Sequence, residues 1–238
     1  MTYTEKNKFY PLLALGMGAV GAFARFTLYR FVQVDGMLPK FHPLDLLCWV
    51  LAAVFAGLLI PSVRKVRPSA EFRRSFPRRT NLIAPGVTAA AGMLVTVLEG
   101  LALTSKLHLV WLLLGFASIP ALVVIGMQRT QGNMPAAWLY SILCLFYGVH
   151  LILCYQIWSG NPQIPDYSFQ LLACVSLVLA SYHRSAFSAG LGKRRGHLIF
   201  SLLSGFFCTL CCVHSDFPWL YLTSGAFFLC DLTFRNKK

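Results

Sequence analysis

The stretch Arg64-Lys-Val-Arg-Pro-Ser-Ala-Glu-Phe-Arg-Arg-Ser-Phe-Pro-Arg-Arg79 lies between two long apolar runs and decides the fold class. Seven of its residues are Lys or Arg, against a single acid, Glu71. Short loops with so much positive charge stay on the cytoplasmic side of a membrane, and the flanking apolar runs are long enough to cross it. The stretch therefore predicts a membrane protein and fixes the side on which its neighbouring segments begin and end.

The composition agrees with a membrane protein. The chain has 238 residues, of which 57% are hydrophobic and 12% are charged, whereas about a quarter of residues are charged in a soluble domain. One core in water cannot bury that much apolar surface, but a surface that faces lipid needs no burial. The net charge of +13 comes from loops between apolar runs, without aromatic residues interleaved among the basic ones on a polar face. We therefore expect the lipid bilayer, and no nucleic acid, as a partner.

Eight apolar runs are candidates for membrane-spanning helices. We predict an all-α, polytopic transmembrane helix bundle that forms one transmembrane domain over residues 1–238, with both termini in the cytoplasm. The predicted spans cover about residues 9–31, 44–63, 81–104, 109–127, 136–158, 168–187, 197–213 and 217–234. Arg25 interrupts the first span and the last two are short, so seven spans are an alternative to eight.

The basic residues agree on one orientation. With the loop of residues 64–79 inside, four of the 21 Lys and Arg residues lie outside: Arg25, Arg30, Lys40 and Lys106. Three tryptophans then lie near the outer ends of spans, where an aromatic belt is expected: Trp111, Trp158 and Trp219. This asymmetry predicts a multi-pass protein of a bacterial-type cytoplasmic (inner) membrane.

Three ionisable residues within the spans are candidates for an intramembrane polar site: Arg25, Glu99 and His150. Below the outer span ends, Arg25 lies roughly 9 Å deep, Glu99 roughly 7–8 Å deep and His150 about 12 Å deep. A charge at such depth usually has a partner or faces a water-filled cavity. One interpretation is a polar cavity that opens outward. The other is a structural ion pair between Arg25 and Glu99, with His150 bonded to a neighbouring carbonyl.

The cysteines provide a weaker candidate for a metal site. All eight lie within apolar runs, as small hydrophobic residues do, which argues against a disulfide framework. Cys208, Cys211 and Cys212 share a helical face and precede His214, and thiolates with imidazole suit zinc or copper. Their apolar surroundings explain them without a ligand, so we predict no metal and no other cofactor.

The inner surface is expected to contact lipid. Four arginines of the basic loop should lie close to the inner leaflet and attract anionic lipids: Arg73, Arg74, Arg78 and Arg79. The same loop, residues 64–79, could meet an acidic protein partner. Asp231 precedes Arg235 by four residues, which is typical of pairing on a helix surface.

Two stretches resemble known families. Gly18-Ala-Val-Gly-Ala-Phe-Ala-Arg-Phe26 resembles the opening helix of small fluoride-channel proteins, over that one helix only. Val34-Asp-Gly-Met-Leu-Pro39, followed by His42-Pro-Leu-Asp45 and Trp49, is similar to a pattern in uncharacterised bacterial polytopic membrane proteins. The second resemblance implies a polytopic fold and no particular activity.

Two function classes follow from these features. The first is a carrier or channel for a small solute or ion, with Pro120 as a possible hinge within its span. The second is a membrane anchor or partner subunit that transports nothing and presents a basic cytoplasmic face. An enzyme ranks third, because no nucleophile and base can be paired in the sequence.

Overall fold

The computed structural model describes residues 3–32, 42–64, 81–101, 106–159, 167–213 and 215–233. Within these residues the regular structure is entirely helical, so the all-α helix bundle predicted from the sequence is confirmed. The elements are α1 (Tyr3–Thr27), the π-helical turn η1 (Leu28–Val32), α2 (Pro43–Arg64), α4 (Ile83–Gly100), α5 (Lys106–Gln131), α6 (Ala137–Ser159), α7 (Ser168–Ser188), α8 (Arg194–Cys211) and α9 (Pro218–Thr233).

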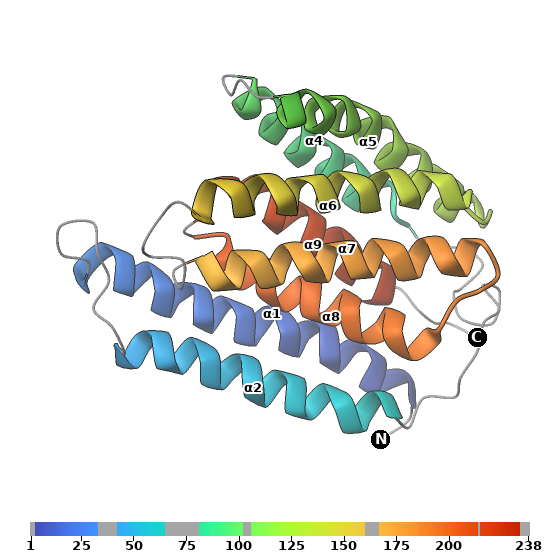
Figure 1. The fold of residues 1–238 in the computed structure, drawn as a ribbon. Coiled ribbons are helices and arrows are strands. Elements are labelled where there is room, and N and C mark those ends of the chain that lie inside the picture. Colours follow the sequence, from blue (N-terminus) through green and yellow to red (C-terminus); the bar gives the residue numbers. More distant parts are fainter. Residues whose placement is uncertain are drawn as a thin grey trace.

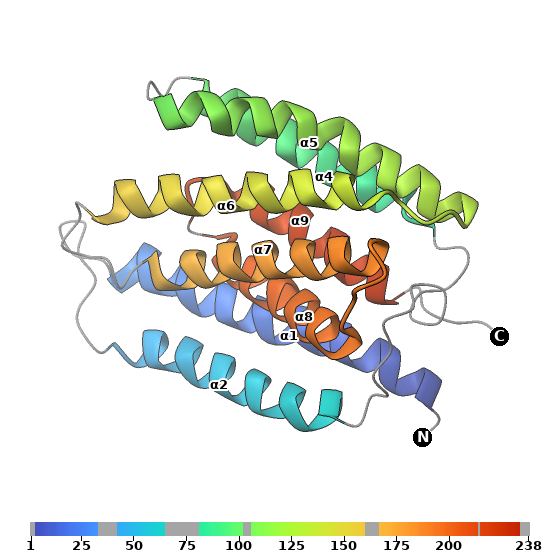
Figure 2. The same cartoon turned by 45° about the vertical axis from the view of Figure 1, so that its right-hand side comes forward.

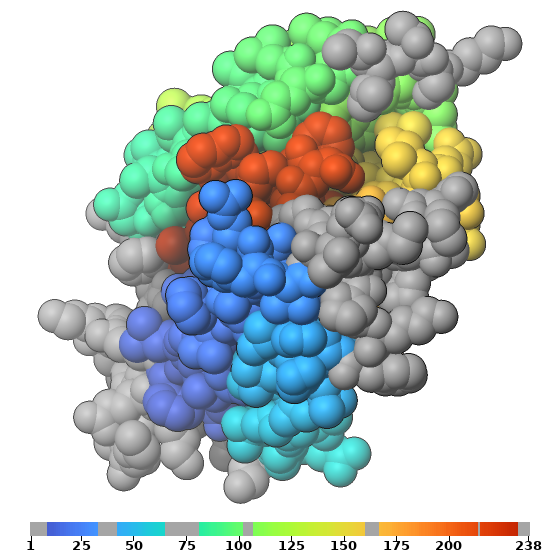
Figure 3. All heavy atoms as spheres, turned by 90° about the vertical axis from the view of Figure 1, so that its left-hand side faces the viewer, coloured from blue at the N-terminus to red at the C-terminus, as the bar shows by residue number. Residues whose placement is uncertain are grey.

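The helices run side by side between two ends of the bundle (Figures 1 and 2). The α4–α5 pair forms one side and the α1–α2 pair forms the other, with α6, α7, α8 and α9 between them. Figure 3 shows the red-orange C-terminal segment between the blue of α1 and the green of α4. Helix α9 packs against α4 and α8, and also contacts α1 and α7. It is therefore a central element of the bundle.

The outer surface of the bundle is apolar, as a lipid-facing surface requires. Phe23, Leu113 and Ile157 are examples of large hydrophobic side chains that are more than half exposed on long helices. Six helical segments among the described residues are long and apolar enough to cross a membrane: Phe9–Val32, Pro43–Arg64, Ile83–Gly100, Leu107–Gln131, Ala137–Ser159 and Ser168–Ser188. The chain is therefore an integral, multi-pass membrane protein.

Helices α8 and α9 coincide with the two short spans predicted from the sequence. They have 18 and 16 residues, which correspond to lengths of about 27 and 24 Å. Their side chains are mostly buried, including Phe206, Leu210, Leu220 and Phe228. Because these helices pack inside the bundle, they do not need the uniformly apolar surface of a lipid-facing span. Their membrane crossing, and hence the number of eight spans, stays a prediction.

Small residues allow the helices of the bundle to approach closely. A stripe of small residues on α1 is buried at Ala14, Gly18 and Ala22. A Cβ atom at Gly18 would lie 2.9 Å from Cβ of Thr209 on α8, closer than such atoms can come. A Cβ atom at Gly126 on α5 would lie 2.7 Å from the carbonyl oxygen of Leu82, which directly precedes α4. Packing through small residues replaces the hydrophobic driving force that lipid cannot provide.

Candidate functional site

One face of α9 carries a stripe of polar side chains through the interior of the bundle. Tyr221, Ser224 and Asp231 are each at most 3% exposed. Their separations of three and seven residues place them on the same helical face, along about 15 Å of the axis. We call these three residues the α9 stripe. Phe228, also buried, lies on this face between Ser224 and Asp231, and it separates the polar groups into two clusters.

The first cluster surrounds His150 of α6. The indole Nε1 of Trp111 donates a hydrogen bond to Nδ1 of His150, at 3.2 Å. Because an indole N–H only donates, Nδ1 accepts, and a neutral imidazole then carries its proton on Nε2. This nitrogen lies 3.3 Å from the hydroxyl of Tyr221. The Tyr221 hydroxyl in turn lies 3.1 Å from Sγ of Cys174 on α7. The result is a buried hydrogen-bonded chain across α5, α6, α9 and α7.

Aromatic rings and a second hydroxyl pair complete this cluster. The ring of His150 is stacked on Phe146, with an interplanar angle of 7°, and its centroid lies 5.4 Å from that of Phe217. About one helical turn before His150 on α6, Tyr147 donates a hydrogen bond of 2.7 Å to Oγ of Ser224. Apolar rings thus lie next to two sets of hydrogen-bonded polar side chains. We call these residues the His150 cluster: Trp111, Tyr147, His150, Cys174, Tyr221 and Ser224.

The second cluster contains three buried charged side chains. Asp231 of α9 is in direct contact with the guanidinium of Arg184 on α7. Its Oδ1 also lies 3.7 Å from Nη2 of Arg129 on α5. The guanidinium carbon of Arg184 lies 5.7 Å from the ring centroid of Tyr140 on α6. All four side chains are at most 3% exposed. We call them the inner cluster, because they lie at the end of the bundle that is predicted to be cytoplasmic.

The three predicted residues do not gather in one site. Arg25 is buried, donates a hydrogen bond of 3.1 Å to the hydroxyl of Tyr29, and holds its guanidinium carbon 5.0 Å from the ring centroid of Phe169. Glu99 is exposed on α4 and forms no ion pair with Arg25. His150 contacts the side chains of Trp111, Tyr221 and Cys154, and none of its hydrogen bonds within the described residues goes to a carbonyl. A functional role for Arg25, Glu99 or His150 stays a prediction.

Several other predicted contacts have different surroundings in the structure. Asp231 was expected on a helix surface, but it is 3% exposed and pairs with Arg184, because α9 lies inside the bundle. Trp111 and Trp158, expected in an aromatic belt, are also buried, whereas Trp219 is 53% exposed. The inner-leaflet arginines Arg73, Arg74, Arg78 and Arg79 lie outside the described residues, as does His214.

The cysteines remain separate thiols. All eight are free, and Cys208 and Cys211 are fully buried in α8. Among the described residues no group of three or more His, Cys, Asp or Glu side chains is arranged to hold a metal ion. Thiols of α8 hydrogen-bond to carbonyls of their own helix, for example Cys211 to Cys208 at 3.6 Å.

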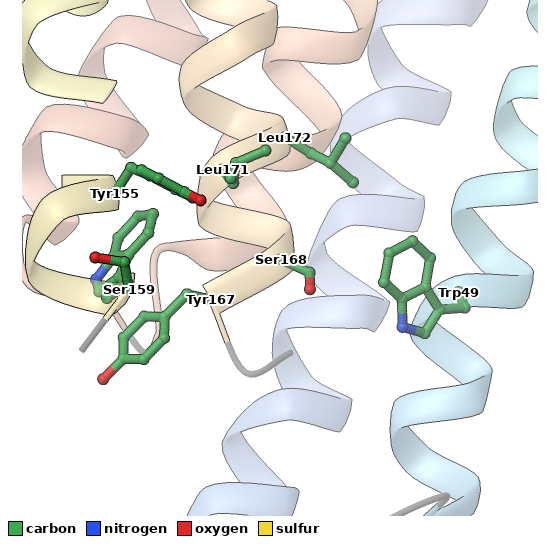
Figure 4. A pocket seen from close by; sticks show the side chains of 8 residues that line it. Trp49, Tyr155, Ser159, Tyr167, Ser168, Leu171 and Leu172 are labelled. Carbon is green, nitrogen blue, oxygen red and sulfur yellow. The ribbon is translucent and has the colours of Figure 1, made fainter. Parts of the chain in front are cut away.

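A cleft of about 260 Å³ opens between α2, α6 and α7, at the end of the bundle predicted to face outward (Figure 4). Trp158 is stacked on Tyr167 along one side of it, with ring centroids 4.9 Å apart, and Trp49 lies on the opposite side. The ring of Trp49 contacts the ring of Phe169, and the guanidinium of Arg25 lies over that same ring of Phe169. The lining residues are Trp49, Tyr155, Trp158, Ser159, Tyr167, Ser168, Leu171 and Leu172.

Comparisons with protein-family models, curated proteins and solved structures find no match. The class that the fold defines is therefore the integral membrane helix bundle, and the function has to be argued from the buried polar groups themselves. Sequence reasoning selected His150 but missed Arg129, Tyr140 and Arg184. The two arginines lie near the ends of apolar helices, where a basic residue is normally read as a positive-inside charge.

Proposed function

We propose that the protein is a carrier or channel that moves a small solute or ion across the membrane along the α9 stripe. The observation that carries this proposal is the burial of Tyr221, Ser224 and Asp231 on one face of a central helix. Polar and ionisable side chains within spans are expensive and typically mark substrate or ion pathways. If the α9 stripe served only for packing, apolar residues at the same positions would avoid the free-energy cost of burying polar groups.

The division of the stripe into two clusters supports a gated pathway. The His150 cluster and the inner cluster lie on either side of Phe228. The nearest polar residues of the α9 stripe, Ser224 and Asp231, are each about one helical turn away from Phe228. A solute that binds at one cluster would have to pass this ring to reach the other. Carriers bind their solute inside the bundle and expose the site to the two sides in turn. Helix α5, which contributes both Trp111 and Arg129, also contains Pro120 between them.

The test measures whether water reaches the stripe. Ser224→Cys is introduced into a variant without native cysteines, and a membrane-impermeant anionic methanethiosulfonate reagent is added to the protein in liposomes. Ser181→Cys is the matched control, because Ser181 is also fully buried but bonds to a carbonyl of its own helix, Leu177. The exposed Ser159→Cys shows that the reagent is active. We expect residues 159 and 224 to react and residue 181 to stay unmodified.

Equal protection of residues 224 and 181 would contradict transport along the stripe. Hydroxyl-radical footprinting of Tyr147 and Tyr221 in the unaltered protein supplies an independent measure of water access, should the cysteine-free variant fail to fold. A dry stripe by both measures would favour the second candidate, a membrane anchor or partner subunit. The seven basic residues of the loop 64–79 are the feature that favours that candidate.

A further inference from the structure

The cleft between α2, α6 and α7 is apolar in its depth and carries hydroxyl groups at its rim. Four of the described residues that line it are aromatic, two are leucines, two are serines, and none is charged. Ser159 is the last residue of α6, and Ser168 is the first residue of α7. Leu171 and Leu172 lie about one helical turn further into the bundle than Ser168 (Figure 4). The polar groups of the cleft therefore gather where the helices end.

Contacts outside the cleft hold its walls in place. The indole Nε1 of Trp158 donates a hydrogen bond of 3.4 Å to Oδ2 of Asp216, and the ring of Trp158 is stacked on Tyr167. On the opposite side, the ring centroids of Trp49 and Phe169 lie 4.6 Å apart. Trp158 and Phe169 are at most 3% exposed. Packed residues therefore form the cleft before any ligand enters, as is usual for ligand pockets.

A cavity with this lining requires an apolar occupant. A buried water needs two to four polar partners, and an apolar cavity of ~150 Å³ stays dry and binds benzene. Leu171 and Leu172 offer water no such partner in the depth of the cleft. If the cleft stayed empty, its walls would lose van der Waals contacts. Its volume of about 260 Å³ gives room for a hydrocarbon group larger than benzene.

The cleft opens onto the lipid-facing surface of the bundle. Two of its lining residues, Tyr155 of α6 and Trp49 of α2, are 54% and 42% exposed. Ile152 and Leu46 precede them by three residues on the same helical faces and are 50% and 62% exposed. In a bilayer such a surface meets acyl chains. The cleft is therefore continuous with the interface between protein and lipid.

We propose that the cleft binds one acyl chain of a glycerophospholipid from the outer leaflet. The chain would contact the leucines and the aromatic rings, and the ester groups of the lipid would lie at the rim. Ser168 can donate a hydrogen bond to an ester carbonyl, whereas the hydroxyl of Ser159 already donates to the carbonyl of Gln156. Because the headgroup stays outside, no charged residue is needed in the lining. The inference goes beyond the proposed transport and does not depend on it.

Native mass spectrometry of the purified full-length protein tests the inference by counting the phospholipids that stay bound after washing with detergent. Leu172→Trp fills the cleft with a larger side chain. Leu113→Trp is the matched control, because Leu113 lies on α5, is 62% exposed and does not line the cleft. We expect the unaltered protein and Leu113→Trp to retain one phospholipid, and Leu172→Trp to lose it.

Tryptophan fluorescence supplies a second measurement, should Leu172→Trp fail to fold. Variants that keep Trp158 or Trp111 as the single tryptophan are placed in liposomes of phosphatidylcholine with brominated acyl chains, since bromine quenches an indole that it contacts. Both side chains are at most 3% exposed, so lipid around the bundle reaches neither directly. Only Trp158 lines the cleft. We expect quenching of Trp158 to exceed that of Trp111 severalfold.

Equal lipid retention by Leu172→Trp and Leu113→Trp would overturn the inference, as would equal quenching of Trp158 and Trp111. An unaltered protein that retains no phospholipid would also overturn it. A dimer that Leu172→Trp alone dissociates would assign the cleft to a second copy of the chain instead. None of these variants changes the α9 stripe, so the outcome is separate from that of the transport test.

Discussion

Individual buried arginines are held in this bundle by two different means. Arg184 contacts a carboxylate, that of Asp231, directly. Arg25 instead lies between aromatic rings, with its guanidinium carbon 5.0 Å from the ring centroid of Phe169 and 5.3 Å from that of Tyr29. A desolvated cation above an aromatic face gains about 2 kcal/mol. Aromatic faces can therefore help to hold a charge within a span.

Arg25 and Glu99 should behave as independent residues. We expect Arg25→Ala to lower the free energy of unfolding by ~2 kcal/mol or more, because it removes the cation from its aromatic cage. Glu99→Ala, at an exposed position, should change it by less than ~0.5 kcal/mol. The double variant should equal the sum of the two within ~0.5 kcal/mol. Reversible unfolding in mixed detergent micelles measures all three, and a coupling well above that margin would restore the ion pair predicted from the sequence.

The polar residues differ in how far sequence alone could identify them. His150 could be selected because it is an ionisable residue in the middle of an apolar run. The partners of His150 could not be identified from the sequence, because Trp111 and Tyr221 are 39 and 71 residues away from it along the chain. The same difficulty applies to Arg129 and Arg184, because their partner Asp231 lies on another helix, far away along the chain.

At the scale of helices, the packing of α5 on α4 depends on residues without a side chain. Gly126→Ala should destabilise the protein by about 1–3 kcal/mol, because the added Cβ would meet a backbone oxygen, which cannot move aside like a flexible side chain. Gly57→Ala on α2 is the matched control, since no atom lies within 4 Å of the corresponding position. Thermal unfolding in detergent compares them. A Gly126→Ala variant as stable as Gly57→Ala would show that α4 and α5 do not approach this closely.

The positions of the helices along the chain could be predicted from the sequence better than whether each helix faces lipid or other helices. Apolar runs bounded by Pro, Gly and basic residues indicated segments that overlap all eight α-helices of the described chain. The same runs could not reveal that α8 and α9 pack in the interior, because burial against protein and exposure to lipid select similar residues. The polar residues of α9 become interpretable only once its neighbours are known.

At the scale of the whole molecule, the proposed transport depends on the orientation of the bundle in the membrane. Helix α1 begins and α9 ends at the same end of the bundle, which is the arrangement that an even number of crossings produces (Figures 1 and 2). The inner cluster lies at this end, and the His150 cluster lies toward the other. We propose that this end is cytoplasmic, so that a solute meets the inner cluster from inside the cell.

Cysteine labelling of intact cells tests that claim most directly. Single cysteines are placed at Ser69, in the basic loop, and at Asn161, between α6 and α7, in a background without native cysteines. We predict that a membrane-impermeant maleimide modifies residue 161 in intact cells and modifies residue 69 only after the membrane is opened. Modification of residue 69 from outside, with residue 161 protected, would contradict the orientation on which both proposals are built.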